Sequence, residues 1–306
     1  SGEVLQLYVD RGAFEASAHG GRLFCSDCHR QYETFPHPPR QISFRREYTL
    51  ASYEVCRRCH FANYTRTLDS IHFELLSLGD LRTPVCVDCH GSHAVLPPEK
   101  PRANISRTCS RCHAAVYEDY ISSVHGQALV EENNLDVPVC TDCHGAHVIR
   151  DPRTTAFHLA TPELCARCHS DPQLMGRYGL STRVTQTYLR EFHGATVSLR
   201  SQAKAEAPFL EAVCTDCHGV HDITRTDDPS SPVMRANLLN TCRQCHPGAT
   251  ENFPAAWLSH YEPSLEKAPL VYMVRLFYLI FIPFVLLGLS LHVLLDLWKG
   301  IFFGRR

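Results

Sequence analysis

The chain has 306 residues, with 30 Lys and Arg against 32 Asp and Glu and a formal charge of −2 at pH 7 when histidine is neutral. No basic patch stands out, which excludes a nucleic-acid-binding protein that works through a basic surface. The length would suggest one to three domains. However, a chain with 2 Trp, 3 Met, 16 Gly and 19 Pro has little material for a conventional apolar core.

The 16 cysteines all fall into eight copies of one motif, CxxCH, in which a histidine directly follows the second cysteine. This spacing is the attachment signature of a c-type haem, whose vinyl groups take up both thiols while the histidine binds the iron from the proximal side. Zinc explains paired cysteines but not a histidine after every pair, and disulfides explain an even count but not this spacing. We therefore predict eight covalent haem c groups, which would form much of the core. The predicted thioether cysteines and proximal iron ligands are Cys25, Cys28 and His29; Cys56, Cys59 and His60; Cys86, Cys89 and His90; Cys109, Cys112 and His113; Cys140, Cys143 and His144; Cys165, Cys168 and His169; Cys214, Cys217 and His218; and Cys242, Cys245 and His246.

The eight motifs alternate in composition, so the chain contains an internal repeat. The odd-numbered motifs (odd motifs) carry Asp between the cysteines, and the even-numbered ones (even motifs) carry Arg or Gln. We predict one octahaem domain over residues 1–262, built of four two-haem repeats at about 10–64, 65–118, 119–185 and 186–262. The expected fold is mainly α with sparse secondary structure, in which short helices and loops are wrapped around the haems.

A second set of histidines recurs outside the motifs. A segment ending in histidine precedes each odd motif, and another follows the last motif; we predict short amphipathic helices with the histidine in the last turn and Gly20, Gly126 and Gly194 as helix stops. Three odd motifs also continue as CHGxH, and only the first does not. Of 19 histidines, eight are proximal, and eight of the remaining eleven are enough to ligate every iron twice. The predicted distal ligands are His19, His72, His93, His125, His147, His193, His221 and His260.

The other side chains near the motifs leave alternatives open. His37, in a Pro-rich loop, is a possible rival for one distal position, and His158 is expected to be only a surface residue. Two imidazoles on one iron leave no open position, which is typical of an electron relay rather than a catalyst. Several arginines either pair with haem propionates or are simply solvated charges. These arginines are Arg57, Arg58, Arg107, Arg111, Arg167 and Arg243.

The recurrent SxHG, followed by VCxDCHGxH and paired with a second CxxCH, resembles the bacterial multihaem cytochromes c with doubled CxxCH motifs. The matching residues are Ser123 to Gly126, Val139 to His147 and Cys165 to His169, with their counterparts over about residues 10–260. The resemblance implies haems packed in stacked and perpendicular pairs, bis-histidine ligation, and electron transfer in respiration. It also implies that a histidine of one repeat can ligate a haem of another. The first repeat departs from the pattern, which leaves its ligands open.

The segment from Leu276 to Leu295 has twenty residues and no formally charged side chain, which is enough to cross the hydrocarbon region. We predict a C-terminal membrane anchor over residues 263–306 with a single span at about 272–298, the alternative being a buried helix of a soluble protein. Lys299, Arg305 and Arg306 follow the span and predict a cytoplasmic C-terminus, with the haems on the periplasmic side. Haem attachment of this kind requires export, and we expect that a signal peptide ahead of Ser1 has been removed.

His292 lies inside the predicted span, four residues before Asp296. A histidine in a membrane span indicates a function: a ligand to a haem b shared with a partner, or part of a quinone site. The alternative is a hydrogen bond to a neighbouring helix. A single span cannot supply a haem b site, so either role requires an integral membrane partner that is quinone-linked or cytochrome b-like.

These features predict a membrane-anchored octahaem cytochrome that relays electrons between such a partner and soluble or surface carriers. One alternative is an octahaem reductase or oxidase of the nitrite, tetrathionate or hydroxylamine type, which needs an open iron position. No CxxCK motif of the nitrite reductase kind is present, since all eight motifs end in histidine. A further alternative is a filament of stacked haems in which subunits exchange ligands.

Overall fold

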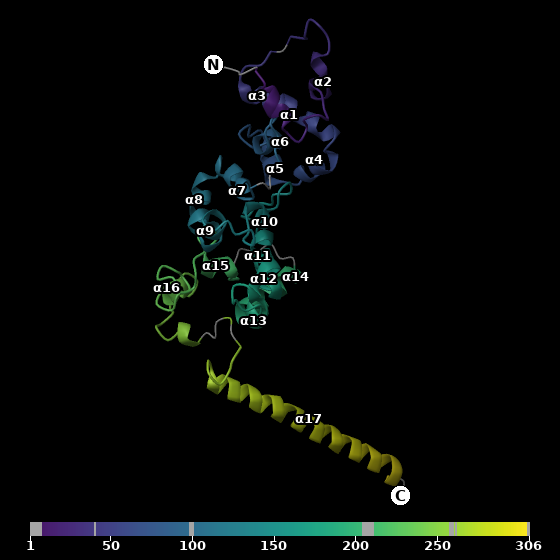
Figure 1. The fold of residues 1–306 in the computed structure, drawn as a ribbon. Coiled ribbons are helices and arrows are strands. Elements are labelled where there is room, and N and C mark those ends of the chain that lie inside the picture. The colour runs from purple at the N-terminus through teal and green to yellow at the C-terminus, as the bar shows by residue number, and fades with distance from the viewer. Residues whose placement is uncertain are drawn as a thin grey trace.

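The computed structural model describes residues 8–39, 41–97, 101–203, 211–256, 260 and 262–304. Within these residues the secondary structure is helical and contains no strand, which confirms the predicted mainly α fold. Helices α1 to α16 follow one another in chain order along an elongated body, and α17 extends away from its end, so the two termini lie at opposite ends (Figure 1).

Most of the helices are short. The elements in chain order are α1 (Arg11–Glu15), α2 (Cys25–Cys28), η1 (Arg30–Tyr32), α3 (Arg45–Ser52), η2 (Tyr53–Arg58), α4 (Phe61–Thr67), α5 (Ile71–Ser77), α6 (Cys86–His90), α7 (Ala103–Ser110), α8 (Ala114–Ser122), α9 (Val124–Val130), α10 (Cys140–His144), α11 (Thr155–His169), α12 (Pro172–Gly176), α13 (Val184–Arg190), α14 (Phe192–Ala203), α15 (Cys214–His218), α16 (Leu238–Arg243), η3 (Pro254–Ala256) and α17 (Pro269–Phe303), where η marks a 3-10 helix. The predicted boundaries between repeats fall inside α4, α8 and α13, so consecutive repeats are joined through helices.

Each odd motif forms a helix of its own, and its Asp caps that helix. Asp142 accepts a hydrogen bond from the backbone N–H of Val139 at 2.6 Å, just ahead of the first cysteine. The Asp residues of the other three odd motifs make the same bond at 2.7 Å. A capped N-terminus stabilises a helix too short to form alone. The recurrence of Asp at the same position of all four odd motifs therefore has a local structural cause.

The glycine of CHGxH ends these helices in a conformation that other residues avoid. Gly91, Gly145 and Gly219 have φ angles of +75°, +81° and +85°, with ψ close to 180°. This region of backbone space is essentially restricted to glycine. The first odd motif has Arg30 at this position and continues into the 3-10 helix η1 instead, which explains why its sequence departs from the pattern.

We call the histidines that end the segments ahead of the odd motifs (His19, His72, His125 and His193) the SxHG-type histidines. Three of them lie in the first turn of a helix, so their predicted place in a last turn is wrong. His72, His125 and His193 lie in the first turns of α5, α9 and α14, each of which follows another helix after a sharp break. Ser123 is the N-cap of α9 and accepts the backbone N–H of Gly126 at 3.1 Å. Serine in this position favours the start of a helix over the continuation of the preceding one.

The predicted role of Gly126 and Gly194 as helix stops is also wrong, since both lie within helices. A Cβ on Gly126 would come 1.9 Å from the carbonyl oxygen of Tyr120, and one on Gly194 would come 2.2 Å from that of Tyr188. Gly20 lies in a turn, with the same close approach to the Glu15 carbonyl oxygen. These glycines are therefore required where the break brings two backbone segments together.

Consecutive repeats are joined by a backbone hydrogen bond that recurs three times. The donor is the backbone N–H of the residue directly before an SxHG-type histidine. The acceptor is a backbone carbonyl oxygen of the next repeat, two residues after its CHGxH histidine. The three bonds, each 2.8 Å long, run from Ala18 to Val95, from Ile71 to Ile149 and from Val124 to Ile223. This regular register brings each SxHG-type histidine close to a CHGxH histidine of the next repeat.

The polypeptide forms little core of its own. The main cluster of buried apolar residues contains only Tyr120, Leu129 and Val139. The accessible surface is 22299 Å², whereas a compact folded monomer of 34.6 kDa exposes about 13,000 Å². The exposed helix α17 accounts for part of this excess. A chain with so small a core fits the expectation that bound groups supply much of the packing.

Candidate functional site

The two predicted sets of histidines meet in the structure as eight pairs, each with one histidine from a CxxCH motif and one from the distal set. The distances between ring centroids are 6.1 Å for His29 and His93, 6.1 Å for His60 and His19, 6.1 Å for His90 and His147, 6.3 Å for His113 and His72, 6.0 Å for His144 and His221, 6.3 Å for His169 and His125, 6.3 Å for His218 and His260, and 6.2 Å for His246 and His193. Every member of both sets is used once.

This spacing has a definite chemical meaning. Metal–imidazole bonds are about 2.0 Å long and a ring nitrogen lies about 1.1 Å from its ring centroid, so two imidazoles on opposite sides of one metal ion have centroids about 6.2 Å apart. Aromatic rings in contact have centroids anywhere from about 4.5 to 7 Å apart, whereas the eight pairs all keep to 6.0–6.3 Å. Each pair therefore has the spacing expected for one metal ion between its rings.

The donor set fits a haem iron better than a bare metal ion. Among the described residues no three His, Cys, Asp or Glu side chains converge as a metal site, whereas a structural zinc ion needs four protein ligands. A porphyrin supplies four nitrogen ligands in the plane, and two histidines complete the coordination. None of the 16 cysteines forms a disulfide, so every motif keeps both thiols for attachment.

The pairs follow one rule along the chain. Each even-motif histidine pairs with the SxHG-type histidine that precedes the odd motif of its own repeat, as His169 does with His125. Each odd-motif histidine pairs with the CHGxH histidine of the next repeat, as His144 does with His221. The last odd motif has no repeat after it in this sequence, and His260 takes that place opposite His218. The repeats are thus interlocked.

The first repeat differs from the others at one position of this scheme. Tyr32 occupies the position at which the other odd motifs have their second histidine. In the other repeats that histidine pairs with the odd motif of the preceding repeat, so the first odd motif has no histidine for this role. His37 contacts the rings of Tyr32 and Phe35, and its Nδ1 lies 2.9 Å from the carbonyl oxygen of Thr34. The structure does not bring His37 opposite a CxxCH histidine.

Burial favours the neutral form, which binds metals, in several of the paired imidazoles. Desolvation lowers the pKa of His125 to about 4, with a smaller contribution from His169. Burial is also the first cause of the lowered pKa of His72, His169 and His218. A buried imidazole is costly to charge, and a metal ligand must be the neutral ring. At neutral pH these side chains are ready to coordinate without losing a proton.

Cysteine thiols of neighbouring motifs touch across the repeat junctions. The Cys140 thiol hydrogen-bonds that of Cys109, which lowers the pKa of Cys140 to about 6 and raises that of Cys109. The same contact joins Cys86 to Cys56 and Cys214 to Cys165. Each pair links the first cysteine of an even motif to the first cysteine of the following odd motif. These thiols would hold their attached groups at the junction between one repeat and the next.

In each of the same junctions, a side chain of one repeat faces the capping Asp of the next. Arg46, ahead of the second motif, forms an ion pair with Asp88 at 2.7 Å, and Arg102 forms the equivalent pair with Asp142. At the third junction this side chain is a histidine: His158 Nε2 lies 3.5 Å from an Asp216 oxygen. It also lies 3.0 Å from the Glu211 carbonyl oxygen. The expectation that His158 is only a surface residue is therefore wrong, because its side chain is mostly buried in a junction.

Two of the arginines beside the even motifs bind backbone. Arg58 donates to the carbonyl oxygen of Asp27 at 2.8 Å, and Arg111 donates to that of Asp88 at 2.9 Å. Both bonds join the two motifs of one repeat. The equivalent residue in the fourth repeat is Gln244, and there the neighbouring Arg243 bonds to the carbonyl oxygen of Ala249.

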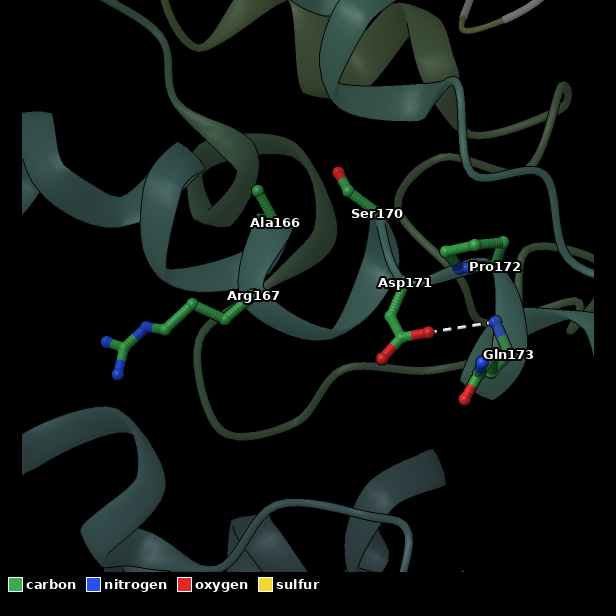
Figure 2. A pocket seen from close by; sticks show the side chains of 6 residues that line it. All are labelled: Ala166, Arg167, Ser170, Asp171, Pro172 and Gln173. Atoms are coloured by element: carbon green, nitrogen blue, oxygen red, sulfur yellow. Dashed lines mark hydrogen bonds between the residues drawn. The ribbon is translucent and has the colours of Figure 1, made fainter.

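Arg167, the equivalent in the third repeat, lines two surface hollows beside α11. One has a volume of about 480 Å³ and is also lined by Ser170 and Asp171. Figure 2 shows the Arg167 side chain extending away from Asp171, whose carboxylate accepts the backbone N–H of Gln173. The second hollow, of about 420 Å³, is lined by Arg150 as well. Arg150 and Arg167 are therefore the arginines best placed to meet an acidic group in these hollows.

Helix α17 is apart from the histidine pairs. Among the described residues it is the only helix long and apolar enough to cross a membrane, and no part of its most apolar stretch is buried. This exposure disagrees with the alternative of a buried helix. The predicted span at about 272–298 lies within α17, where His292 and Asp296 are both exposed.

Residues 81–170 match the family model described as cytochrome c3. This range holds four of the eight motifs, from Cys86 to His169. The match supports a multihaem cytochrome c with covalently bound haem c and a function in electron transfer. No curated protein and no solved structure matches the chain.

Proposed function

We propose that this chain is a membrane-anchored octahaem c-type cytochrome that relays electrons between an integral membrane partner and soluble or surface redox carriers. The observation that carries the proposal is the set of eight histidine pairs, one for each CxxCH motif, all with centroids 6.0–6.3 Å apart. Each haem, when bound, supplies an iron that takes up and gives back one electron.

The residues of the chain hold, orient and insulate these groups. The 16 motif cysteines would form the thioether bonds, and the paired histidines would provide both axial ligands. Ligation by two imidazoles leaves no position for a substrate, which favours a relay over a reductase or oxidase. The junction thiols, such as Cys109 and Cys140, favour a single path in which electrons pass along the repeats in sequence order.

The pairing also argues against a filament held by ligand exchange between copies. All eight pairs form within one chain, which leaves no member of the two histidine sets for a second copy.

Helix α17 would moor the haem domain to the cytoplasmic membrane, with the haems on the periplasmic side and the C-terminus in the cytoplasm. Its length and exposure support this arrangement. Removal of residues 263–306 should move the protein from the membrane fraction to the soluble fraction with its haem content unchanged. The variant His292→Ala is the matched control and should stay in the membrane. A truncated chain that still sediments with membranes contradicts the anchor.

His292 is the residue of α17 that we assign to the contact with the membrane partner, as a ligand to a shared haem b or as part of a quinone site. Its position within the span, together with Asp296 one turn later, supports this role. Spectra of the purified complex test it: a haem b signal that disappears in His292→Ala is expected for the first form. A complex that has only c-type absorbance and no quinone response contradicts both.

Two measurements on the mature full-length chain test the relay itself. Intact-mass spectrometry should show eight added haems. Electron paramagnetic resonance of the oxidised protein should show low-spin iron only. A high-spin signal from one haem supports the enzyme alternative, and an added mass of zinc or nothing contradicts any cytochrome.

A further inference from the structure

The three junctions between repeats share an apolar contact that the first repeat lacks. The residue before the first cysteine of an odd motif is Val85, Val139 or Val213 in repeats 2 to 4, and these side chains are 8%, 2% and 2% exposed. Partly buried residues of the preceding repeat, such as Ile105, pack against the cluster that contains Val139. In repeat 1 the equivalent residue is Phe24, which is 79% exposed. The first repeat therefore exposes a phenylalanine at the position where the other three repeats bury a valine.

The charge at this position is also unpaired in the first repeat. Asp88, Asp142 and Asp216 each cap their motif and each face a cationic or titratable side chain of the preceding repeat. Asp27 makes the same cap to the Phe24 N–H, but no cationic side chain pairs with it among the residues that the structure describes. The Asp27 carboxylate can therefore still pair with a cation, whereas those of Asp88, Asp142 and Asp216 already face a side chain of the preceding repeat.

The thiol contact is missing as well. Cys86, Cys140 and Cys214 each hydrogen-bond a thiol of the preceding even motif, whereas Cys25 is exposed. Phe24, Cys25 and Asp27 therefore correspond to the residues that form an internal junction, but none of them makes the corresponding contact with another residue that the structure describes. In Figure 1 this face, on α2, lies at the end of the body remote from α17.

We infer that this face, which Phe24, Cys25 and Asp27 form, docks a soluble redox partner that completes the junction from outside. The internal junctions define what fits: a haem edge against Cys25, an apolar contact for Phe24 and a cation for Asp27. The partner is thus a small c-type cytochrome with a lysine or arginine beside its exposed haem edge. This inference rests on the proposed function and names the site at which the relay meets its soluble carrier.

Stopped-flow kinetics with the full-length holoprotein tests the inference, with a small basic monohaem cytochrome c as the probe. The second-order rate constant for electron transfer from the reduced chain should fall about threefold or more in Asp27→Asn at low ionic strength, and its salt dependence should flatten, because a rim charge acts mainly on association. Asn keeps an oxygen that can cap Phe24. Phe24→Ser should lower the rate at high salt too.

Two matched variants separate docking from a general loss of structure. Asp227→Asn makes the same change at an exposed carboxylate outside the motifs (side chain 72% exposed), and Leu199→Glu changes another exposed apolar residue (68% exposed) on α14; both should keep the wild-type rate. Equal effects of Asp27→Asn and Asp227→Asn, or no effect of the two first-repeat variants, overturn the docking site while leaving the relay intact. A wild-type chain that passes no electrons to the probe counts against the proposed function itself. A dimer that Phe24→Ser dissociates means that a second copy covers the face, and this result also overturns the inference.

Discussion

The imidazole rings of His144 and His221 lie with centroids 6.0 Å apart, although His144 ends the odd motif of the third repeat and His221 follows that of the fourth. A metal ion between them would be held from two repeats at once. The pair formed by His169 and His125 lies within the third repeat. The two kinds of pair therefore differ in what they stabilise.

His221→Ala should open one iron position and also weaken the junction between repeats 3 and 4. His125→Ala should open one position with a smaller effect on that junction. Each should add one high-spin ferric signal in electron paramagnetic resonance. Limited proteolysis should cut between repeats 3 and 4 faster in His221→Ala than in His125→Ala. His37→Ala is the control and should remain low-spin; a high-spin signal in that variant would make His37 a ligand after all.

Gly145→Ala should destabilise the protein more than Gly91→Ala. Both residues have a φ angle near +80°, and a side chain in this region costs about 1–3 kcal/mol. A Cβ on Gly145 would also come 2.5 Å from the carbonyl oxygen of Val148, whereas one on Gly91 meets nothing within 4 Å. Denaturant unfolding followed by the Soret band measures the two losses. Equal losses would mean that the clash at Gly145 relaxes freely.

His158→Ala should weaken the third junction by about 1 kcal/mol, because it removes one partly buried polar contact to Asp216 and one to the Glu211 carbonyl oxygen. His158→Arg should retain most of the stability, since Arg46 and Arg102 occupy the equivalent positions in the first two junctions. The free energy of unfolding of the two variants is the measurement. A loss in His158→Arg as large as that in His158→Ala contradicts the equivalence of the three positions.

Stability should fall as the pH drops from about 6.5 to about 4. The unfolded chain binds protons on histidine in this range, whereas burial lowers the pKa of His125 in the folded chain to about 4. The stabilisation is fully present above pH 6.5 and is lost as the pH falls through this window. The lowered pKa of His72, His169 and His218 acts in the same direction, and coordination to iron adds to it. Denaturant midpoints at pH 7, 6, 5 and 4 test this; a midpoint that stays constant disproves it.

Local features of the fold follow from the sequence because their causes lie within a few residues. Asp142 caps the helix whose N-cap residue, Val139, lies three positions before it, and Gly145 ends the same helix. The reversed position of His125, at the start of α9 rather than the end of α8, was missed although Ser123 carried the signal of an N-cap. The burial of His158 could not be foreseen, since Asp216 and Glu211 reach it from a different repeat.

The features that depend on short spacing can be read from the sequence: eight CxxCH motifs, each with its adjacent histidine, and a second set of eight histidines sufficient in number to face them. Which histidine faces which depends on how the helices pack, both within a repeat and between one repeat and the next. The backbone hydrogen bond from Ala18 to Val95, for example, joins the first two repeats, from which His29 and His93 meet. The distances that matter for coordination are a few ångströms between residues far apart in the sequence, and tertiary packing sets such distances.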